Sequence, residues 1–167
     1  LGDVYKRQTL LRAEQDALLL EVWQACNKSG HELLLEVILP ENGPDKDERH
    51  YHTMLEHFYQ LGIKPDWWKL PPLSSASWQQ ITALIEREDP WSRGILILGL
   101  DAPSDKLRAG FAEAAAHPMI KGFAVGRTIF GQPSRRWMQG ELSDEALIEE
   151  VKRNYLTLIG YWREARR

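Results

Sequence analysis

The hydrophobic and polar positions of this 167-residue chain fall into two kinds of segment that alternate along it. Short apolar runs, typical of buried strands, occur at 32–40, 67–70, 94–101 and 122–126. Between them, apolar residues recur every three or four positions, as they do in amphipathic helices. Strands that alternate with helices predict parallel strands joined by crossover helices, so we expect an α/β domain.

The first helix is predicted from Thr9 onward, ending at a glycine cap at Gly30. A second helix should end at Gly62, and serines should start three later helices. The apolar stripe of the first helix is Leu11, Leu18, Val22 and Ala25, and the three serines are Ser77, Ser104 and Ser143.

The last helix is expected to bury one apolar side, and polar loops are expected at 41–47 and between Phe130 and Ser143. The predicted buried side of this helix consists of Leu147, Val151, Tyr155, Leu158 and Trp162.

Four strand–helix units fit either a doubly wound sheet or half of an eight-stranded (β/α)8 TIM barrel, which needs about 250 residues. Residues 3–8 spell the hexapeptide that one reading frame of a sequencing-library transposon end encodes, and no Met starts the chain. We therefore expect residues 1–8 to be an adapter scar and residues 9–167 to be a partial, N-terminally truncated domain, the C-terminal half of a TIM barrel.

The composition of the chain argues against several classes of function. With 43% hydrophobic and 27% charged residues the chain should fold, and its net charge of -3, without a basic block, argues against nucleic-acid and membrane partners. Cys26 is the single cysteine, which excludes an internal disulfide and fits a reducing compartment. We expect a soluble, cytoplasmic protein.

Lys69 is the first candidate for chemistry. It lies in the apolar strand 67–70, which Pro71 and Pro72 end. Desolvation disfavours an ammonium ion, and a neutral amine is a nucleophile that can form a Schiff base with a carbonyl substrate. The alternative is a lysine whose stem packs on tryptophans while its ammonium reaches solvent or a carboxylate.

Glu36 ends the preceding strand at a similar depth. Neighbouring strands lie roughly 5 Å apart, so Glu36 and Lys69 can meet. A carboxylate beside an imine-forming lysine can carry the protons that imine formation and carbon–carbon cleavage need. An ion pair without chemistry is the other interpretation.

Gly126 and Arg127 follow the fourth strand and offer a close backbone approach, helix amides and a guanidinium to an anion. Together with Lys69 they suggest a phosphorylated carbonyl substrate. Asp101, at the end of the third strand, either binds substrate hydroxyls or caps the loop before Ser104.

Other chemistry has weaker support in the sequence. His50 and His52 face different sides of a helix, and His57 is two turns from His50, so we predict no metal site. The chain has no dinucleotide, Walker, nucleophile-elbow or paired-cysteine motif, and we expect no cofactor.

Four strings of this chain resemble a known family: His31–Val37, Gly62–Leu70, Gly99–Pro103 and Lys121–Phe130. They are similar to the uncharacterised domain often fused to the C-terminus of bacterial 5-dehydro-2-deoxygluconokinase, a kinase of inositol catabolism. That domain in turn resembles class I aldolases of the tagatose-bisphosphate type, which are (β/α)8 barrels.

This resemblance implies roles for the candidate residues. In those aldolases, strand five carries a proton-transferring glutamate and strand six the Schiff-base lysine, and a Gly-Arg phosphate grip follows strand eight. Glu36, Lys69, Gly126 and Arg127 occupy the matching positions. The aldolases have a small-residue phosphate loop after strand seven, where this chain has Gly99-Leu100-Asp101.

The resemblance also implies a reaction. Fusion to the kinase points to cleavage of 6-phospho-5-dehydro-2-deoxygluconate by a Schiff-base aldolase, with the kinase as an N-terminal partner domain in the parent chain. The alternative is a non-catalytic module that binds a sugar phosphate and regulates or stabilises the kinase. In either case a homo-oligomer is compatible with the sequence, and little activity is expected from the half barrel alone.

Overall fold

The computed structural model describes residues 2–39 and 47–167, and for residues 2–10 it describes the backbone alone. Helices and strands alternate through the described residues, so the predicted α/β class is confirmed. The elements are α1 (Gly2–Ser29), β1 (Leu34–Glu36), α2 (Arg49–Gln60), β2 (Trp67–Leu70), α3 (Ser75–Glu88), β3 (Gly94–Ile97), α4 (Ser104–Ala114), β4 (Ile120–Phe123), α5 (Arg127–Met138) and α6 (Asp144–Ala165).

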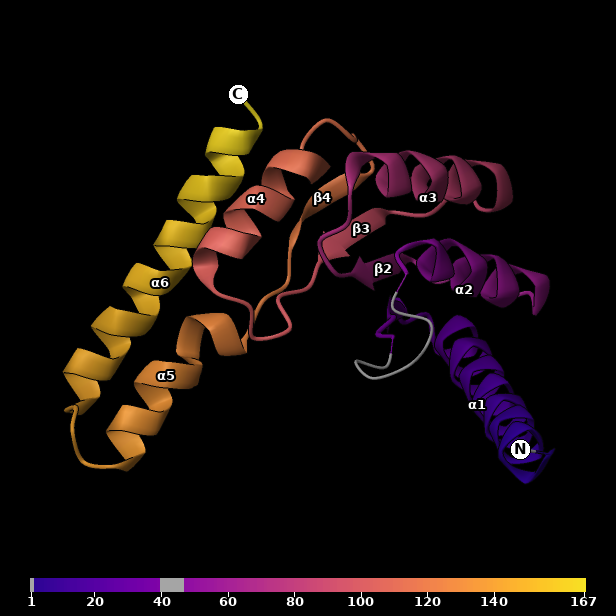
Figure 1. Cartoon of the computed structure of the whole chain (residues 1–167), viewed down its shortest axis with the longest axis horizontal. Coiled ribbons are helices and arrows are strands. Elements are labelled where there is room, and N and C mark those ends of the chain that lie inside the picture. Colours follow the sequence, from indigo (N-terminus) through magenta and orange to yellow (C-terminus); the bar gives the residue numbers. More distant parts are fainter. Residues whose placement is uncertain (1, 40–46) are drawn as a thin grey trace.

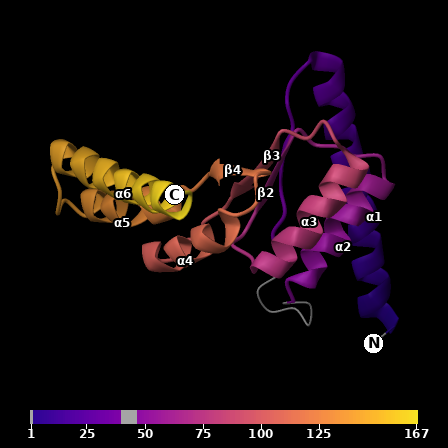
Figure 2. The ribbon, with the colours of Figure 1, turned by 90° about the horizontal axis from the view of Figure 1, so that it is seen from above.

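The four strands form one parallel sheet in the order β1-β2-β3-β4. In Figure 1, α1, α2 and α3 lie toward the β2 end of the row of strands and α4, α5 and α6 toward the β4 end, and Figure 2 shows the same division from above. Consecutive strands are neighbours, so all four carboxyl ends meet at one edge of the sheet. In register, Glu36 is opposite Lys69, Lys69 opposite Leu96, and Leu96 opposite Gly122.

Helices cover only one face of this sheet. Trp68, Ile95 and Ile97 point to that face and are fully buried, together with Leu55 of α2 and Phe111 of α4. The residues between them in each strand lie on the other face and stay partly open. The run 32–40 was predicted, as a continuous apolar run, to be a strand buried on both faces, and its described part is covered on one face only.

The strand itself is short, and Leu34 and Ile38 are exposed while Leu35 and Val37 are buried. This segment pairs with β2 on one side only, because it stands at the edge of the sheet. Edge position and an uncovered face together account for its alternating exposure.

The two glycines predicted to end helices are confirmed, whereas two of the three serines predicted to cap helices do not do so. Gly30 and Gly62 both have positive φ after α1 and α2, as a helix-ending glycine does. Ser74, three residues before the predicted Ser77, caps α3 by accepting from the Ser77 amide. Ser104 is the first residue of α4 rather than its cap. The prediction that Ser143 caps α6 is confirmed.

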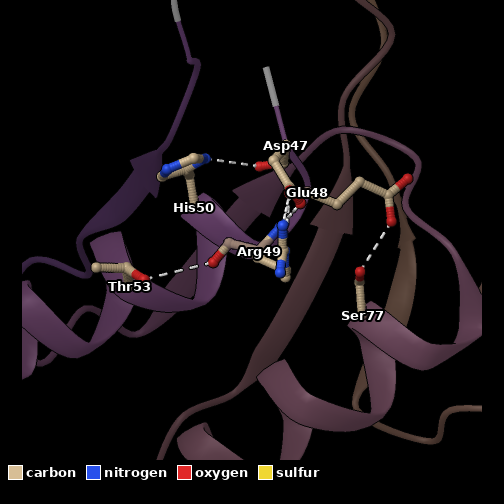
Figure 3. Close-up of polar contacts among 6 residues, drawn as sticks. All are labelled: Asp47, Glu48, Arg49, His50, Thr53 and Ser77. Carbon is tan, nitrogen blue, oxygen red and sulfur yellow. Dashed lines mark hydrogen bonds and ion pairs between the residues drawn. The ribbon is translucent and has the colours of Figure 1, made fainter. Parts of the chain in front are cut away.

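Glu48, just before α2, holds Ser74, the cap residue of α3, in place. Its carboxylate accepts hydrogen bonds from the amide and hydroxyl of Ser74, at 3.0 and 2.7 Å, and from the Ser77 hydroxyl at 2.8 Å. Figure 3 shows Glu48 reaching toward Ser77, while Asp47 faces Arg49 and His50. Glu48 thus ties the start of α2 to the start of α3. The remainder of the predicted loop at 41–47 lies outside the described residues.

Burial tends to raise the pKa of the Glu48 carboxyl, but the hydrogen bonds from Ser74 and Ser77 outweigh it, so the pKa lies below its ordinary value. The ionised carboxylate is therefore the form that the fold favours.

The segment between Phe130 and Ser143 was predicted to be a polar loop, but most of it belongs to helix α5. Contacts with α6 hold this helix: Arg136 pairs with Glu150 at 2.8 Å, and Asn154 donates to the Ile129 carbonyl at 2.8 Å. In Figure 1, α5 and α6 lie side by side. Of the predicted buried side of α6, Leu158 is buried, Tyr155 is exposed, and the other three are partly buried.

The apolar stripe predicted for α1 faces outward. Leu11, Leu18 and Val22 are exposed, whereas Leu19 and Trp23 pack against the core. The prediction of a helix was therefore right, but α1 buries the face that carries Leu19 and Trp23 and not the predicted one.

Candidate functional site

The loops that follow the four strands surround a cavity of about 290 Å³ at the carboxyl edge of the sheet, which we call the inner hollow. All five residues proposed from the sequence line it: Glu36, Lys69, Asp101, Gly126 and Arg127. Ligands of α/β proteins bind at this edge, so the location suits a site. The other lining residues are Ile38, Gly99, Leu100, Ala124, Val125, Thr128 and Phe130.

Glu36 and Lys69 are in direct contact in the inner hollow. Lys69 Nζ lies 3.1 Å from Glu36 Oε1, and the two residues are register partners on β1 and β2. The Lys69 side chain is 21% exposed and that of Glu36 is 39% exposed, so the pair lies at the opening of the hollow rather than deep in the core. At this distance one proton transfer turns the ion pair into an amine and a carboxylic acid, which are a nucleophile and a general acid.

Gly126 and Arg127 stand where β4 leads into α5. Gly126 accepts hydrogen bonds from the amides of Ile129 and Phe130, which starts the helix. A side chain at Gly126 would approach the Phe130 ring to 3.1 Å, so glycine keeps this wall of the hollow open. Arg127 is exposed and, among the described residues, has no ion-pair partner. Its guanidinium and the first amides of α5 are therefore available to an anion.

Asp101 lies in a tight turn after β3. Both Leu100 and Asp101 have positive φ, of 46° and 61°, and the Ala102 amide donates to the Gly99 carbonyl at 2.8 Å. Left-handed backbone at a leucine is uncommon and costs energy, and such strain collects at functional sites.

Within the described residues, the Asp101 carboxylate makes no hydrogen bond to the loop before Ser104, and Pro103 occupies the cap position of α4. The capping interpretation of Asp101 therefore finds no support. Asp101 instead lines the inner hollow.

Thr128 is a residue that the sequence did not single out. Its hydroxyl donates to the Ala102 carbonyl at 3.0 Å, which ties the turn after β3 to the start of α5. This bond sets the position of Asp101 relative to Arg127. A signal was present, because Thr128 directly follows the Gly-Arg pair.

Among residues 11–39 and 47–167, no three histidine, cysteine or carboxylate side chains are grouped as metal ligands would be. No helix in those ranges has both the length and the apolar character needed to cross a membrane.

Comparison with known proteins gives a family. No curated protein matches the chain. Residues 6–166 match the family DUF2090, described as an uncharacterized protein conserved in bacteria, and this match covers the sheet, the inner hollow, most of α1 and all of α2 to α6. The chain therefore belongs to this bacterial family of uncharacterised conserved proteins.

Proposed function

We propose that this chain is the C-terminal half of a (β/α)8 barrel whose complete form is a Schiff-base aldolase. The observation that supports the proposal best is the 3.1 Å contact between Lys69 Nζ and Glu36 Oε1, inside a hollow that Arg127 also lines. A nucleophile, a proton carrier and an anion-binding group would then face one small molecule.

The first stage is imine formation. Lys69 passes a proton to Glu36, and the free amine attacks the carbonyl carbon of the substrate. Glu36, now protonated, gives its proton to the oxygen of the carbinolamine, and water leaves as the carbon–nitrogen double bond forms. Glu36 is ionised again at the end of this stage.

The second stage is cleavage. Glu36 takes the proton of the substrate hydroxyl on the carbon beyond the bond that breaks, and that carbon becomes an aldehyde. The electrons of the broken carbon–carbon bond move into the protonated imine and give an enamine on Lys69. Protonation of the enamine and addition of water release the second product and restore the lysine.

Arg127, Gly126 and Asp101 serve substrate binding. Arg127 and the first amides of α5 would hold a phosphate group, since guanidinium groups and helix N-termini both favour dianions. The Asp101 carboxylate would accept hydrogen bonds from substrate hydroxyls. These residues therefore fit a phosphorylated carbonyl compound with hydroxyl groups, and the family resemblance implies that it is a keto sugar acid.

The family resemblance narrows the substrate further. It points to 6-phospho-5-dehydro-2-deoxygluconate, cleaved in the cytoplasm to dihydroxyacetone phosphate and malonate semialdehyde. The parent chain would carry the kinase that makes this compound as its N-terminal domain.

A second function fits the same geometry, because a Lys69–Glu36 ion pair that takes no part in chemistry would have the same contact distance. Lys69 and Glu36 would then only shape the hollow, and Arg127 would bind a sugar phosphate in a regulatory module attached to the kinase.

Borohydride reduction separates the two functions. Incubated with dihydroxyacetone phosphate and borohydride, the chain should gain the mass of one reduced adduct, because borohydride fixes an imine as a stable amine. Lys69→Met should gain none, while Lys64→Met should react like the wild type, since Lys64 donates to the Glu88 carbonyl away from the hollow.

Binding of the phosphate ester that needs Arg127, with no adduct at Lys69, would select the regulatory function. Turnover that is lost in a chelator and restored by a divalent metal, with no adduct at Lys69, would instead favour a metal-dependent aldolase.

A further inference from the structure

A second and larger cavity lies on the other side of Arg127. It measures about 570 Å³, and we call it the outer hollow. Asp101, Arg127 and Thr128 belong to the lining of both hollows, and the further lining of the outer one comes from the loop before α4, the start of α4, α5 and α6. Its charged side chains are Asp101, Arg127 and Arg135, and its uncharged polar ones include Ser104, Gln132 and Asn154. Its volume falls in the range that small-molecule sites have.

Hydrogen bonds fix the walls of the outer hollow. Asn154 ties α6 to α5 through the Ile129 carbonyl at 2.8 Å, and Thr128 ties the turn before α4 to α5 through the Ala102 carbonyl at 3.0 Å. Leu158, which is 1% exposed, forms part of the inner wall. The cavity therefore lies among three elements that are fastened to one another.

The lining of this cavity carries two arginines and a single carboxylate, that of Asp101, so its net charge is positive. Nearby on α5 and α6, Arg136 pairs with Glu150 at 2.8 Å and Arg153 approaches the same carboxylate at 3.9 Å. Arg127 and Arg135, in contrast, have no ion-pair partner among the described residues. They are the two arginines that line the outer hollow, and they stand eight positions apart on α5, a rise of roughly 12 Å.

The polar groups define the chemistry of the ligand. Arg127, Arg135, Gln132 and Ser104 offer donors to an anionic group. The Asn154 amide already donates through its nitrogen, so its oxygen is left as an acceptor. A ligand that uses both kinds of group carries a phosphate and several hydroxyls.

We infer that the outer hollow is a second binding site, for a small hydroxylated phosphate ester, and that it shares Arg127 with the inner hollow. One guanidinium cannot give its full set of hydrogen bonds to two phosphates, so filling one hollow weakens binding in the other. The coupling rests on the proposed role of Arg127 in the inner hollow. Binding in the outer hollow does not depend on chemistry at Lys69.

Titration of the full 167-residue chain with glycerol 3-phosphate, followed by amide chemical shifts, tests this inference. Backbone amides of Gln132 and Thr157 report on the outer hollow, and those of Gly99 and Ala124 report on the inner one. In the wild type both pairs should shift with saturation. Arg135→Gln should weaken binding about tenfold at the outer reporters, because it removes one charged contact, and binding at the inner reporters should not weaken.

The matched control is Arg136→Gln, whose guanidinium is paired with Glu150, and both reporter pairs should respond as in the wild type. Arg127→Gln should weaken binding at both pairs. Outer reporters that do not shift, or that respond equally in Arg135→Gln and the wild type, would overturn the inference. Neither of these two outcomes changes adduct formation at Lys69. The borohydride experiment therefore tests the proposed aldolase chemistry independently.

Discussion

Glu36 and Lys69 are register partners on two neighbouring parallel strands, and their charged groups meet at 3.1 Å. Both residues occupy positions on the face of the sheet that the helices leave uncovered, because their strand neighbours Leu35 and Trp68 are buried on the other face. The contact thus follows from strand alternation and from parallel pairing. It brings an amine and its proton carrier to the same opening.

Replacing Glu36 by Gln should slow adduct formation at Lys69. An amide cannot take the ammonium proton or return it to the carbinolamine, and positioned proton transfer contributes roughly 10²- to 10⁴-fold to a rate. We expect the rate of borohydride-trapped adduct to fall at least about a hundredfold. Mass spectrometry of quenched time points measures it.

Glu32→Gln is the matched control. Glu32 pairs with Arg93 at 2.8 Å and accepts from the Trp67 indole at 2.8 Å, at the opposite end of the same strands. Its rate of adduct formation should equal that of the wild type. Equal rates in Glu36→Gln and the wild type would show that Glu36 carries no proton in this reaction.

Much of the fold was predictable because each strand can be recognised from a short stretch of sequence. The run Trp67–Leu70 is apolar and ends at two prolines, and the observed strand has those limits. Parallel order followed from the alternation of strands with helices. The meeting of Glu36 and Lys69 needed only their place at the ends of adjacent strands.

Features that depend on distant contacts were not predictable. Helix α5 contains Pro133 and reads as a polar loop, and its contacts to α6, such as Arg136 with Glu150, link segments that no local pattern connects. The buried face of α1 was also missed. Either face of that helix carries leucines, and only packing against α2 and the loop before β2 selects Leu19 over Leu18.

Two glycine-to-alanine changes should have opposite effects on stability. A Cβ at Gly110 would collide with Pro72, which follows β2, so Gly110→Ala should destabilise the chain by about 1–3 kcal/mol. Gly160 lies within α6 with no atom near its Cβ position, so Gly160→Ala should stabilise it by about 0.5–1 kcal/mol. Chemical denaturation measures both, and an identical sign for the two variants would contradict the packing described.

Acid should weaken the tie between α2 and α3. The pKa of Glu48 is lower in the folded chain than its ordinary value of 4.5, so its stabilising contribution is present above that value and is lost as the pH falls through the folded-state value. Glu48→Gln should therefore cost about 1 kcal/mol at neutral pH and progressively less as the pH falls below the ordinary pKa of 4.5.

Urea unfolding at a series of pH values measures this difference. Glu86→Gln, at an exposed position of α3, serves as the control and should change the free energy of unfolding little at any pH. A cost in Glu48→Gln that stays constant from neutral to acid pH would contradict the role of the ionised carboxylate.

The chain on its own should form the imine and yet turn over little substrate. Leu34 and Ile38 beside Glu36 are 42% and 52% exposed, so water reaches the site from the uncovered face of the sheet. Water weakens electrostatic stabilisation of the transition state and competes for the enamine. A coupled assay for dihydroxyacetone phosphate release measures turnover, and robust turnover would contradict the proposal that half of the barrel is absent.

Peptide mapping of the borohydride-trapped chain is the most direct measurement of the central claim, that the Lys69 amine is the nucleophile. After reaction with dihydroxyacetone phosphate and proteolysis, the reduced adduct should be found on the peptide that contains Lys69, with fragment ions that locate it there. An adduct spread evenly over exposed lysines such as Lys106 and Lys152, or none at Lys69, would contradict the account.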